Sequence, residues 1–366
     1  MLNRIQLATL IACVSLTACQ AGGGDAPAPA SNTAGGTNAP GVAASGDTPA
    51  TATNANGAVA TSTPAPANLS PADANRVPNE LGRIPVVEYH LIGDADGRYA
   101  RERSHFRRDL ELIYARGYRP VTIAQVLDRK IDLPRGLSPV VFVFDDASPG
   151  QFKYIERNGK LEIDPGSGVG IWLDFKKTKP DWANSAVFCM LSGAAVGRSF
   201  FGEKDIEGQK SAWRFPKVKF LADNGFELCD HTLWHANLSK YSDAVVQEQI
   251  ARGVLAIDSA VPGYKVRTFA LPLGVWPKNR ALAKQGSWTD PKSGKVTRYN
   301  FDAILEVSGG PTESPYDPKF NPLSINRIEV FATELEKTLD RLDKNGTRYV
   351  SDGNPATVAK PVAVAQ

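Results

Sequence analysis

Four residues in the middle of the chain could hold a divalent metal ion and use it for hydrolysis. Asp145 and Asp146 directly follow the apolar run PVVFVF, and His231 and His235 follow the run FELCD closely. Two imidazoles and one carboxylate form a ligand set that leaves coordination positions open for water and substrate. The second carboxylate can then take a proton from the bound water. This pattern indicates metal-assisted hydrolysis.

The spacing within the candidate site narrows the chemistry. His231 and His235 are four residues apart, which predicts that they meet on one side of a helical turn. No Glu follows His231, so the HExxH pattern of zinc proteases is excluded. His90, at the end of the run IPVVEY, is a fifth candidate. An Asp pair after a strand is by itself commonly a turn or a helix cap, but its occurrence with HxxxH at successive strand ends favours a functional site.

The surrounding elements are those of an α/β protein. Apolar, β-branched runs alternate with amphipathic helical patterns, which predicts parallel strands joined by crossover helices. The ordered part, roughly residues 83–352, has the size of one (β/α) barrel, whose strands end at a common mouth where the candidate residues would meet. We expect strands at 84–90, 139–144, 186–191, 226–231 and 266–272, and helices at 105–118, 121–129, 213–225 and 242–261.

A long polar segment at 147–185 interrupts this alternation. Loops of that length at a strand end are usually functional, and we expect one here. The sequence GSGVG at 166–170 matches neither the GxSxG motif nor a dinucleotide-binding loop, and we interpret it as a turn.

The N-terminus predicts export. Residues 1–18 contain a short apolar run after Arg4 and end in LTA before Cys19, which resembles a bacterial lipobox with Cys19 as the lipidated residue. The alternative is an ordinary signal peptide that is cut near Ala18. Gln20 favours sorting to the outer membrane of a Gram-negative cell. The Ala-, Gly-, Pro- and Thr-rich segment 19–79 is expected to be a disordered tether, and 353–366 a disordered tail.

Composition limits the partners. The chain has 366 residues and a net charge of only +3, which argues against nucleic acid or another polyanion as its partner. We expect a monomer. Cys189 and Cys229 are the cysteines of the globular part, and they could form a disulfide in an oxidising compartment or remain two buried thiols.

These motifs together resemble the polysaccharide deacetylase family, a group of carbohydrate esterases with a distorted (β/α) barrel. The segment VFDDA at 143–147 is similar to the family's TFDDG motif, HTLWH at 231–235 matches its H-[ST]-x-x-H motif, and ALPLG at 270–274 is similar to its third motif. The resemblance spans roughly Ile84 to Val330. It implies that Asp145 is the general base, that Asp146, His231 and His235 bind the metal, and that the backbone N–H near Leu273, with Pro272 beside it, stabilises the oxyanion.

Three positions depart from the family pattern. Ala147 replaces the Gly after the Asp pair, and Ala270 replaces the Arg of the third motif. The late Leu-x-His, whose His is the usual general acid, has no counterpart, because the chain has no His after His235. Near that place lies INRI at 325–328, similar to the PRI-like segment of one branch. We predict that His90 assists the leaving amine or orients the substrate; the alternative is a structural hydrogen-bonding residue.

The resemblance implies removal of N-acetyl groups from a cell-surface polysaccharide or peptidoglycan that contains N-acetylglucosamine. The expected metal is Zn²⁺, with Co²⁺ or Ni²⁺ as possible substitutes. Trp234 and Trp276 could stack on sugar rings or serve only as packing residues. The alternatives are an O-acetyl esterase that acts on a glycan, a glycan-binding module without catalysis, and a structural envelope lipoprotein that binds no metal.

Overall fold

The computed structural model describes residues 73, 75–193 and 199–360. The predicted signal peptide, Cys19 and nearly all of the predicted tether lie outside these residues. Within the described part of the chain, no helix has both the length and the apolar character needed to cross a membrane.

Seven parallel strands form a closed barrel. Each strand pairs with the next in the order β1-β14-β13-β10-β9-β8-β5, and β1 also pairs with β5, which closes the ring. The predicted (β/α) barrel is therefore confirmed, but the last two strands in the sequence, β13 and β14, were not among the predicted elements. The strands are β1 (Val86–Tyr89), β5 (Ser138–Phe144), β8 (Val187–Met190), β9 (Glu227–Asp230), β10 (Thr268–Ala270), β13 (Ala303–Gly309) and β14 (Ile325–Glu329).

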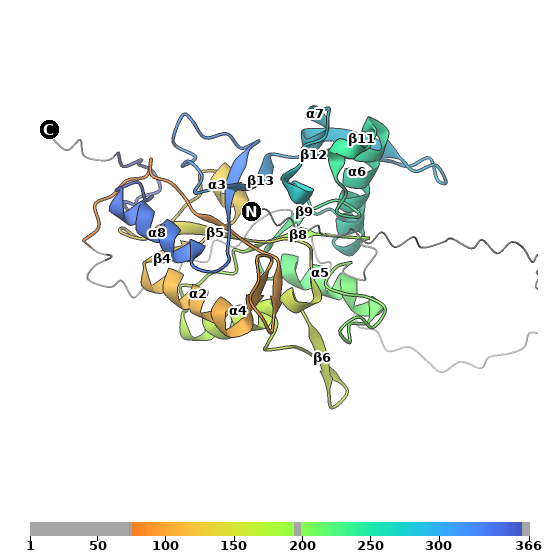
Figure 1. Ribbon diagram of the computed structural model, residues 1–366, viewed down its shortest axis with the longest axis horizontal. Helices are drawn as coiled ribbons and strands as arrows, with labels where there is room; N and C mark the ends of the chain where they lie inside the picture. The colour runs from red at the N-terminus through yellow and green to blue at the C-terminus, as the bar shows by residue number, and fades with distance from the viewer. Residues whose placement is uncertain (1–72, 74, 194–198, 361–366) are drawn as a thin grey trace, which may run out of the picture. The chain divides into compact units, whose positions relative to one another are not determined.

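Helices surround the barrel (Figure 1). They are α2 (Arg103–Ala115), α3 (Ile123–Leu127), α4 (Gly168–Thr178), α5 (Arg214–Asp223), α6 (Asp243–Ala260), α7 (Ala281–Lys284) and α8 (Glu334–Lys344), with short 3₁₀ turns at Pro149–Gln151, Ser211–Trp213, Leu238–Lys240 and Pro272–Gly274. Ser242 is the N-cap of α6, and its side chain accepts a hydrogen bond from the N–H of Val245.

The remaining strands lie outside the ring. β4 (Tyr118–Pro120) pairs with β5. β2 (Leu91–Gly93) pairs with β3 (Ala100–Glu102), β6 (Tyr154–Arg157) with β7 (Lys160–Ile163), and β11 (Gln285–Thr289) with β12 (Val296–Asn300).

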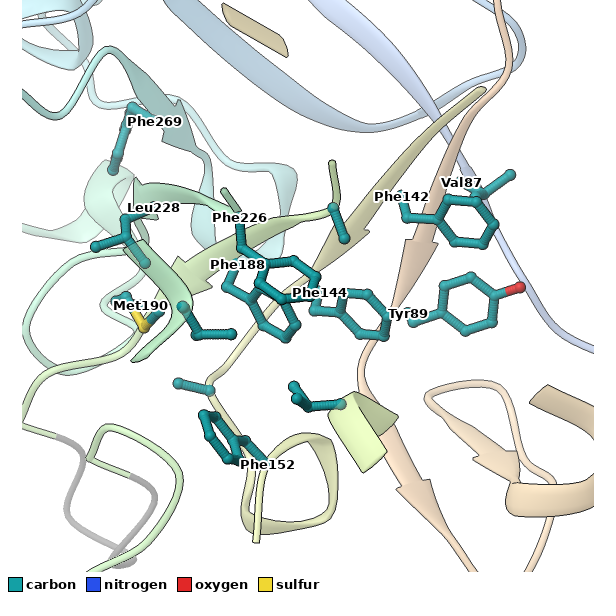
Figure 2. Close-up of a cluster of buried hydrophobic side chains, with 14 of the residues drawn as sticks. Val87, Tyr89, Phe142, Phe144, Phe152, Phe188, Met190, Phe226, Leu228 and Phe269 are labelled. Carbon is teal, nitrogen blue, oxygen red and sulfur yellow. The ribbon is translucent and has the colours of Figure 1, made fainter. Parts of the chain in front are cut away.

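Alternate residues of each barrel strand belong to two separate cores. Small and branched side chains fill the inside of the ring, which is narrow in a seven-stranded barrel; they include Val86, Val141, Val143, Val187, Cys189, Cys229, Ala270, Ala303, Leu305 and Ile325. Larger side chains point outward and pack under the helices, among them Tyr89, Phe142, Phe144, Phe188 and Phe269 (Figure 2). Successive side chains of a strand point to opposite faces, so a residue's place along the strand decides whether it lies inside the ring or under the helices.

The segment 147–185 is not the long irregular loop that we expected. It contains the hairpin β6–β7 and the helix α4. The predicted turn at GSGVG is wrong, since Ser167 is the N-cap of α4 and its hydroxyl accepts from the N–H of Gly170. Trp172 and Phe175 bury the inner face of α4, and this burial supplies the stability that the Gly-rich start of the helix lacks.

The two cysteines left open by the sequence form a disulfide in the barrel interior. Cys189 of β8 and Cys229 of β9 are direct register partners, with Cα atoms 4.2 Å apart and no exposed surface. The bond links two neighbouring strands just beneath the mouth, because His231 follows Cys229 by two residues.

The chain after residue 352 contacts the start of the domain. Glu80 donates its N–H to the carbonyl of Ala359 at 2.8 Å, and its carboxylate accepts from the N–H of Ala359 at 2.9 Å. The predicted tail, 353–366, is therefore tied to the domain as far as residue 359.

Candidate active site

The alternation of the strands places four ionisable side chains together inside the barrel at its carboxyl end. Glu88 is on the same side of its strand as Val86, and Arg327 is on the same side as Ile325. Asp145 and His231 continue the inward-facing positions of β5 and β9. All four are at most 1% exposed, so a buried layer of polar side chains lies at the bottom of the mouth.

The three predicted metal ligands converge. The Nε2 atom of His231 is 3.5 Å and that of His235 3.6 Å from Oδ1 of Asp146, and the three ligand atoms all lie within 4.8 Å of one another. Tetrahedral ligands about 2.1 Å from a metal ion are about 3.4 Å apart. The spacing in the structure is therefore close to that of a metal site.

The tautomer of His231 also suits a ligand. Its Nδ1 lies 2.9 Å from the carbonyl oxygen of Ala270, to which it can donate, and this leaves Nε2 to face Asp146. Burial lowers the pKa of His231, but Asp145 and Asp146 outweigh this effect and raise it to about 9. In the protein alone these carboxylates favour a proton on His231, and a cation bound at Nε2 would take the place of that proton.

The two histidines do not lie on a helical turn, contrary to the expectation from their spacing. The segment 231–235 is irregular, and Thr232 and His235 have φ values of 70° and 59°. The rings still meet, with centroids 4.9 Å apart. Because φ above zero is unfavourable for a β-branched residue, the surrounding structure must impose this conformation.

Helix α6 and strand β9 hold the irregular segment. The carbonyl of Gln249 accepts from the N–H of Leu233 at 3.0 Å, and its side-chain oxygen accepts from the N–H of Trp234 at 3.1 Å. Asp230 accepts from the N–H of Thr232 at 3.2 Å. Gln249 and Asp230 are fully buried, so the backbone between the two histidines is fixed from below.

Asp145 is fixed by an arginine that the sequence analysis did not assign. One terminal guanidinium nitrogen of Arg327 lies 2.9 Å from both carboxylate oxygens of Asp145. Burial raises the pKa of Asp145, but the attraction of Arg327 and His231 is stronger and leaves it below its ordinary value. Asp145 is therefore a carboxylate at neutral pH, as a general base requires.

Arg327 holds the carboxylate of Asp145, whereas Ala270, at the position of the third-motif Arg, has no side chain that could do so. The Arg of the family's third motif is absent at Ala270, and Arg327 enters the barrel from β14 instead, where its Nε also donates to the carbonyl of Glu306. The signal in the sequence was the single Arg of INRIEV, an otherwise strand-like run. It was not recognised because this run was not identified as a strand.

His90 lies beside this group. Its Nε2 is 3.2 Å from Oε1 of Glu88, and its ring makes an edge contact with Tyr99 at 5.1 Å between centroids. The side chain of Gln151 donates to the carbonyls of His90 and Asp145, both at 2.5 Å, and so joins the ends of β1 and β5. Burial lowers the pKa of His90 despite the nearby Asp145 and Asp146.

The third motif forms one edge of the mouth. Leu273 has a φ of 58° and a side chain that is 55% exposed, and Pro272 before it is buried. Trp276 donates from Nε1 to Glu306 at 3.1 Å and lies under the guanidinium of Arg280 at 3.8 Å, so it is anchored as part of the wall. Trp234 is 50% exposed between the two histidines. Of the two tryptophans, Trp234 has the more accessible ring.

Together, a closed parallel barrel and a mouth with two histidines, paired aspartates and a buried arginine define a hydrolase-type (β/α) barrel. The comparisons agree with this class. Residues 185–287 match the family model described as "Polysaccharide deacetylase". A chitooligosaccharide deacetylase of Sinorhizobium fredii is 26% identical over 157 residues, which cover 40% of this chain and 70% of that protein.

Solved structures of the same kind were also found. A polysaccharide deacetylase from Bacillus cereus has a TM-score of 0.49 at 17% identity and covers 71% of this chain and 69% of its own. A deacetylase from Streptococcus pyogenes, solved with acetate, has a TM-score of 0.49 at 17% identity, with coverage of 73% and 99%. The match to the polysaccharide deacetylase family over residues 185–287 and the similarity to a chitooligosaccharide deacetylase agree with the resemblance that the motifs had indicated.

Proposed function

We propose that this protein is a metal-dependent hydrolase that removes N-acetyl groups from a cell-surface glycan containing N-acetylglucosamine. The observation that carries the proposal is the joint geometry of Asp146, His231 and His235 beside the buried carboxylate of Asp145. A glycan-binding module that had lost catalysis would have no need of a base held by its own buried arginine, since such burial costs free energy.

The three ligands fit a Zn²⁺ ion by chemistry as well as by distance. His231 presents a buried Nε2 that makes no hydrogen bond within the described residues, and its other nitrogen is already engaged. When bound, the metal would polarise the acetamide carbonyl and acidify a water molecule. Co²⁺ and Ni²⁺ have similar ligand preferences and should replace Zn²⁺.

The residues of the chain would divide the remaining work. Asp145, held by Arg327, accepts the proton of the attacking water at a carboxylate oxygen. By the family resemblance, the N–H of Leu273 would stabilise the developing oxyanion. His90 gives a proton to the departing amine or orients the sugar, and Trp234 offers a ring on which a sugar can stack.

The test is acetate release from N-acetylglucosamine oligomers by the purified protein loaded with Zn²⁺ or Co²⁺. We expect release that needs the metal and that falls at least ~100-fold in Asp145→Asn, the size of effect expected from loss of a general base. Equal acetate release by the wild type and the Asp145→Asn variant would contradict the role of Asp145. Release from O-acetylated glycans only would favour the esterase, and metal-independent binding without release would favour the binding module.

The substrate and the location of the protein belong to the same proposal. We propose that the chain is exported and anchored through a lipid on Cys19, at the outer membrane, and that it acts there as a monomer. Cys19→Ser should move the protein from the membrane fraction to the soluble fraction. Membrane association that is unchanged in this variant would exclude the anchor.

A further inference from the structure

A basic surface lies on one side of the barrel, where α7 and the hairpin β11–β12 pack over α6 (Figure 1). Residues 264–300 contain eight Lys or Arg and one acid, a net charge of +7. The whole chain carries only +3, so the rest of the chain is net negative. The cations of this basic surface are Lys265, Arg267, Lys278, Arg280, Lys284, Lys292, Lys295 and Arg298.

Most cations of the basic surface are not neutralised by an acid. Lys265 and Arg267 share Asp302, at 3.9 and 2.7 Å, and Arg267 also pairs with Asp128 at 2.8 Å. In the part of the chain that the structure describes, the other six make no ion pair. Asp290, the one acid of the segment, accepts hydrogen bonds within the hairpin turn. Because like charges repel one another, an anionic ligand would relieve this surface.

The exposed face of the hairpin β11–β12 carries polar side chains and no acid. Burial alternates along both strands, so Tyr299 is buried whereas its neighbours Arg298 and Asn300 are exposed. The register places Ser287 opposite Arg298 and Gln285 opposite Asn300. Cross-strand partners on one face are close neighbours. The face therefore presents a guanidinium beside two amides and a hydroxyl.

The same residues line a groove of about 680 Å³, which is formed by the hairpin, α6 and the segment before β10. Lys265 lines it from that segment, with a side chain that is 75% exposed. Val254 of α6 and Val266 add apolar surface to the lining. With Arg298, the lining contains two cations and no acid. The groove thus combines positive charge with hydrogen-bonding side chains.

This lining suits a sugar polymer that carries carboxylates. Lys and Arg pair with carboxylates, and amide and hydroxyl side chains bond to sugar hydroxyls. The basic surface continues beyond the groove, since Lys284 precedes the hairpin and Lys292 and Lys295 lie in its turn, at least ~14 Å further along the strands. Charges spread in this way match charges repeated along a polymer better than one compact anion.

An anionic membrane fits the basic surface less well. Faces that bind membranes combine basic residues with large apolar side chains that insert among the lipids. On the exposed face of the hairpin, the one large apolar side chain is Val296, which is 40% exposed. A recessed groove with amide side chains is also of no use to a bilayer, whereas a glycan chain can enter it.

We propose that this groove, with the basic surface around it, binds an acidic glycan, that is, a polysaccharide with carboxylate groups. Lys265 and Arg298 hold carboxylates, and Gln285, Ser287 and Asn300 bond to sugar hydroxyls. The site is separate from the mouth, because its lining includes no metal ligand and no residue of the third motif. The proposal goes beyond the proposed function, since such binding needs no hydrolysis.

The test is isothermal titration calorimetry of the purified protein with oligogalacturonate, an oligomer with one carboxylate on each sugar. The double variant Lys265→Gln, Arg298→Gln removes both charges of the groove. Its matched control, Lys177→Gln, Lys337→Gln, removes two charges at exposed positions of α4 and α8. Both variants therefore have the same net charge.

A second variant tests the hydrogen bonds of the groove. Gln285→Ala, Asn300→Ala keeps every charge but removes both amides. All the substituted side chains of the groove are exposed, so these variants should fold as the wild type does. Vesicles of phosphatidylglycerol and duplex DNA are titrated with the same proteins as the competing anionic partners.

We expect the double charge variant to bind oligogalacturonate ~10-fold or more weakly than the wild type, because two charge-assisted hydrogen bonds are lost. The amide variant should bind ~3-fold or more weakly. The control should stay within about twofold. Wild-type affinity should fall steeply between about 50 mM and about 500 mM salt, since salt screens charges at an open groove.

Equal losses in the charge variant and its control would overturn the proposal, because positive charge anywhere on the protein would then suffice. Tighter binding to the vesicles or to DNA than to oligogalacturonate would also overturn it. Failure of the proposed function is a separate result. A wild type that bound oligogalacturonate but released no acetate would contradict the deacetylase function and leave the acidic-glycan site in place.

Discussion

At the scale of single residues, Arg327 is the cation on which two buried carboxylates depend. It contacts Glu88 and Asp145 from β14, and its own side chain has no exposed surface. In an ion pair of this kind, removing one partner leaves the other charge buried and uncompensated. The arginine therefore contributes to stability as well as to the state of the base.

Replacement of Arg327 by Met should lower the free energy of unfolding by about 3–5 kcal/mol, because Glu88 and Asp145 would face each other without a cation. Urea unfolding followed by circular dichroism measures this loss. Arg298→Met, at an exposed position on β12, should change stability by less than ~0.5 kcal/mol. An Arg327→Met protein as stable as the wild type would show that the carboxylates are compensated in another way.

Lys217 is a buried cation outside the candidate site. Its Nζ donates to the carbonyl of Phe201 at 2.8 Å and to Gln209 at 2.7 Å, which are both neutral acceptors. Burial, with a smaller contribution from Lys153, lowers its pKa from 10.5 to about 7. The unfolded chain therefore binds more protons between pH 7 and 10.5, and stability should rise with pH in this window.

In the wild type, the titration of Lys217 should make the free energy of unfolding rise by up to ~1.4 kcal/mol per pH unit between pH 7 and 9, and Lys217→Met should remove this rise. Urea unfolding at pH 7, 8 and 9 compares the slopes of the wild type and the variant. Lys219→Met, at an exposed position of the same helix, should keep the wild-type slope. If all three proteins had equal slopes, Lys217 would not be the titrating group.

At the scale of elements, the close contact between α6 and β9 supports the irregular segment with the two histidines. Gly253 of α6 permits it, since a Cβ at this position would lie 2.0 Å from Oδ1 of Asp230. The same helix supplies Gln249, which binds the backbone of the segment. The position of α6 is therefore linked to the geometry of the site.

Gly253→Ala should destabilise the protein by ~1–3 kcal/mol, because the clash with Asp230 outweighs the ~1 kcal/mol that Ala gains in a helix. Thermal unfolding monitors the change. Gly93→Ala is the control, since a Cβ there meets no atom within 4 Å. A higher Tm for Gly253→Ala than for the wild type would mean that α6 can move away from β9 without loss.

The disulfide between β8 and β9 acts on the same part of the barrel. It joins residues 40 apart in the sequence and so restricts the unfolded chain. On the loop-entropy estimate, the Cys189→Ala, Cys229→Ala double variant should lose about 4 kcal/mol. Unfolding in urea without reductant tests this value. The folded wild type can also be treated with reductant before unfolding. If its free energy of unfolding did not change, the reductant would not have reached the buried disulfide.

At the scale of the whole domain, both ends of the described chain meet at the amino end of the barrel. Glu80 is buried there and receives bonds from Tyr349 and from the N–H groups of Asp352 and Ala359. Its carboxylate therefore links the segment before β1 with the segment after α8.

A chain that stops after Asp352 should be less stable than one that stops after Lys360 by about 1–3 kcal/mol, because Glu80 loses two hydrogen bonds to the backbone of Ala359. Differential scanning calorimetry of the two proteins measures the difference. Equal melting temperatures would show that the segment 353–360 adds nothing to the domain and would support the boundary at 352 that the sequence suggested.

Most of the barrel and the main site residues were predictable from local pattern. Strands such as VVFVF carry a continuous apolar run, and polar residues directly after them mark the mouth, because all parallel strands end there. The strands β13 and β14 were missed, since AILEVSG and INRIE mix apolar with charged residues. Glu88 was not singled out, because a lone acid within the strand-like run VVEY belongs to no motif.

The sequence alone predicted the fold class, the resemblance to a family and the set of residues that meet at the mouth, because these follow from motifs, residue type and strand order. Only the tertiary structure decided which partners these residues have. Contacts such as Arg327 with Asp145, Glu88 with His90 and Cys189 with Cys229 join segments through the closure and register of the barrel. Register depends on how all strands pair at once, and no local pattern records it.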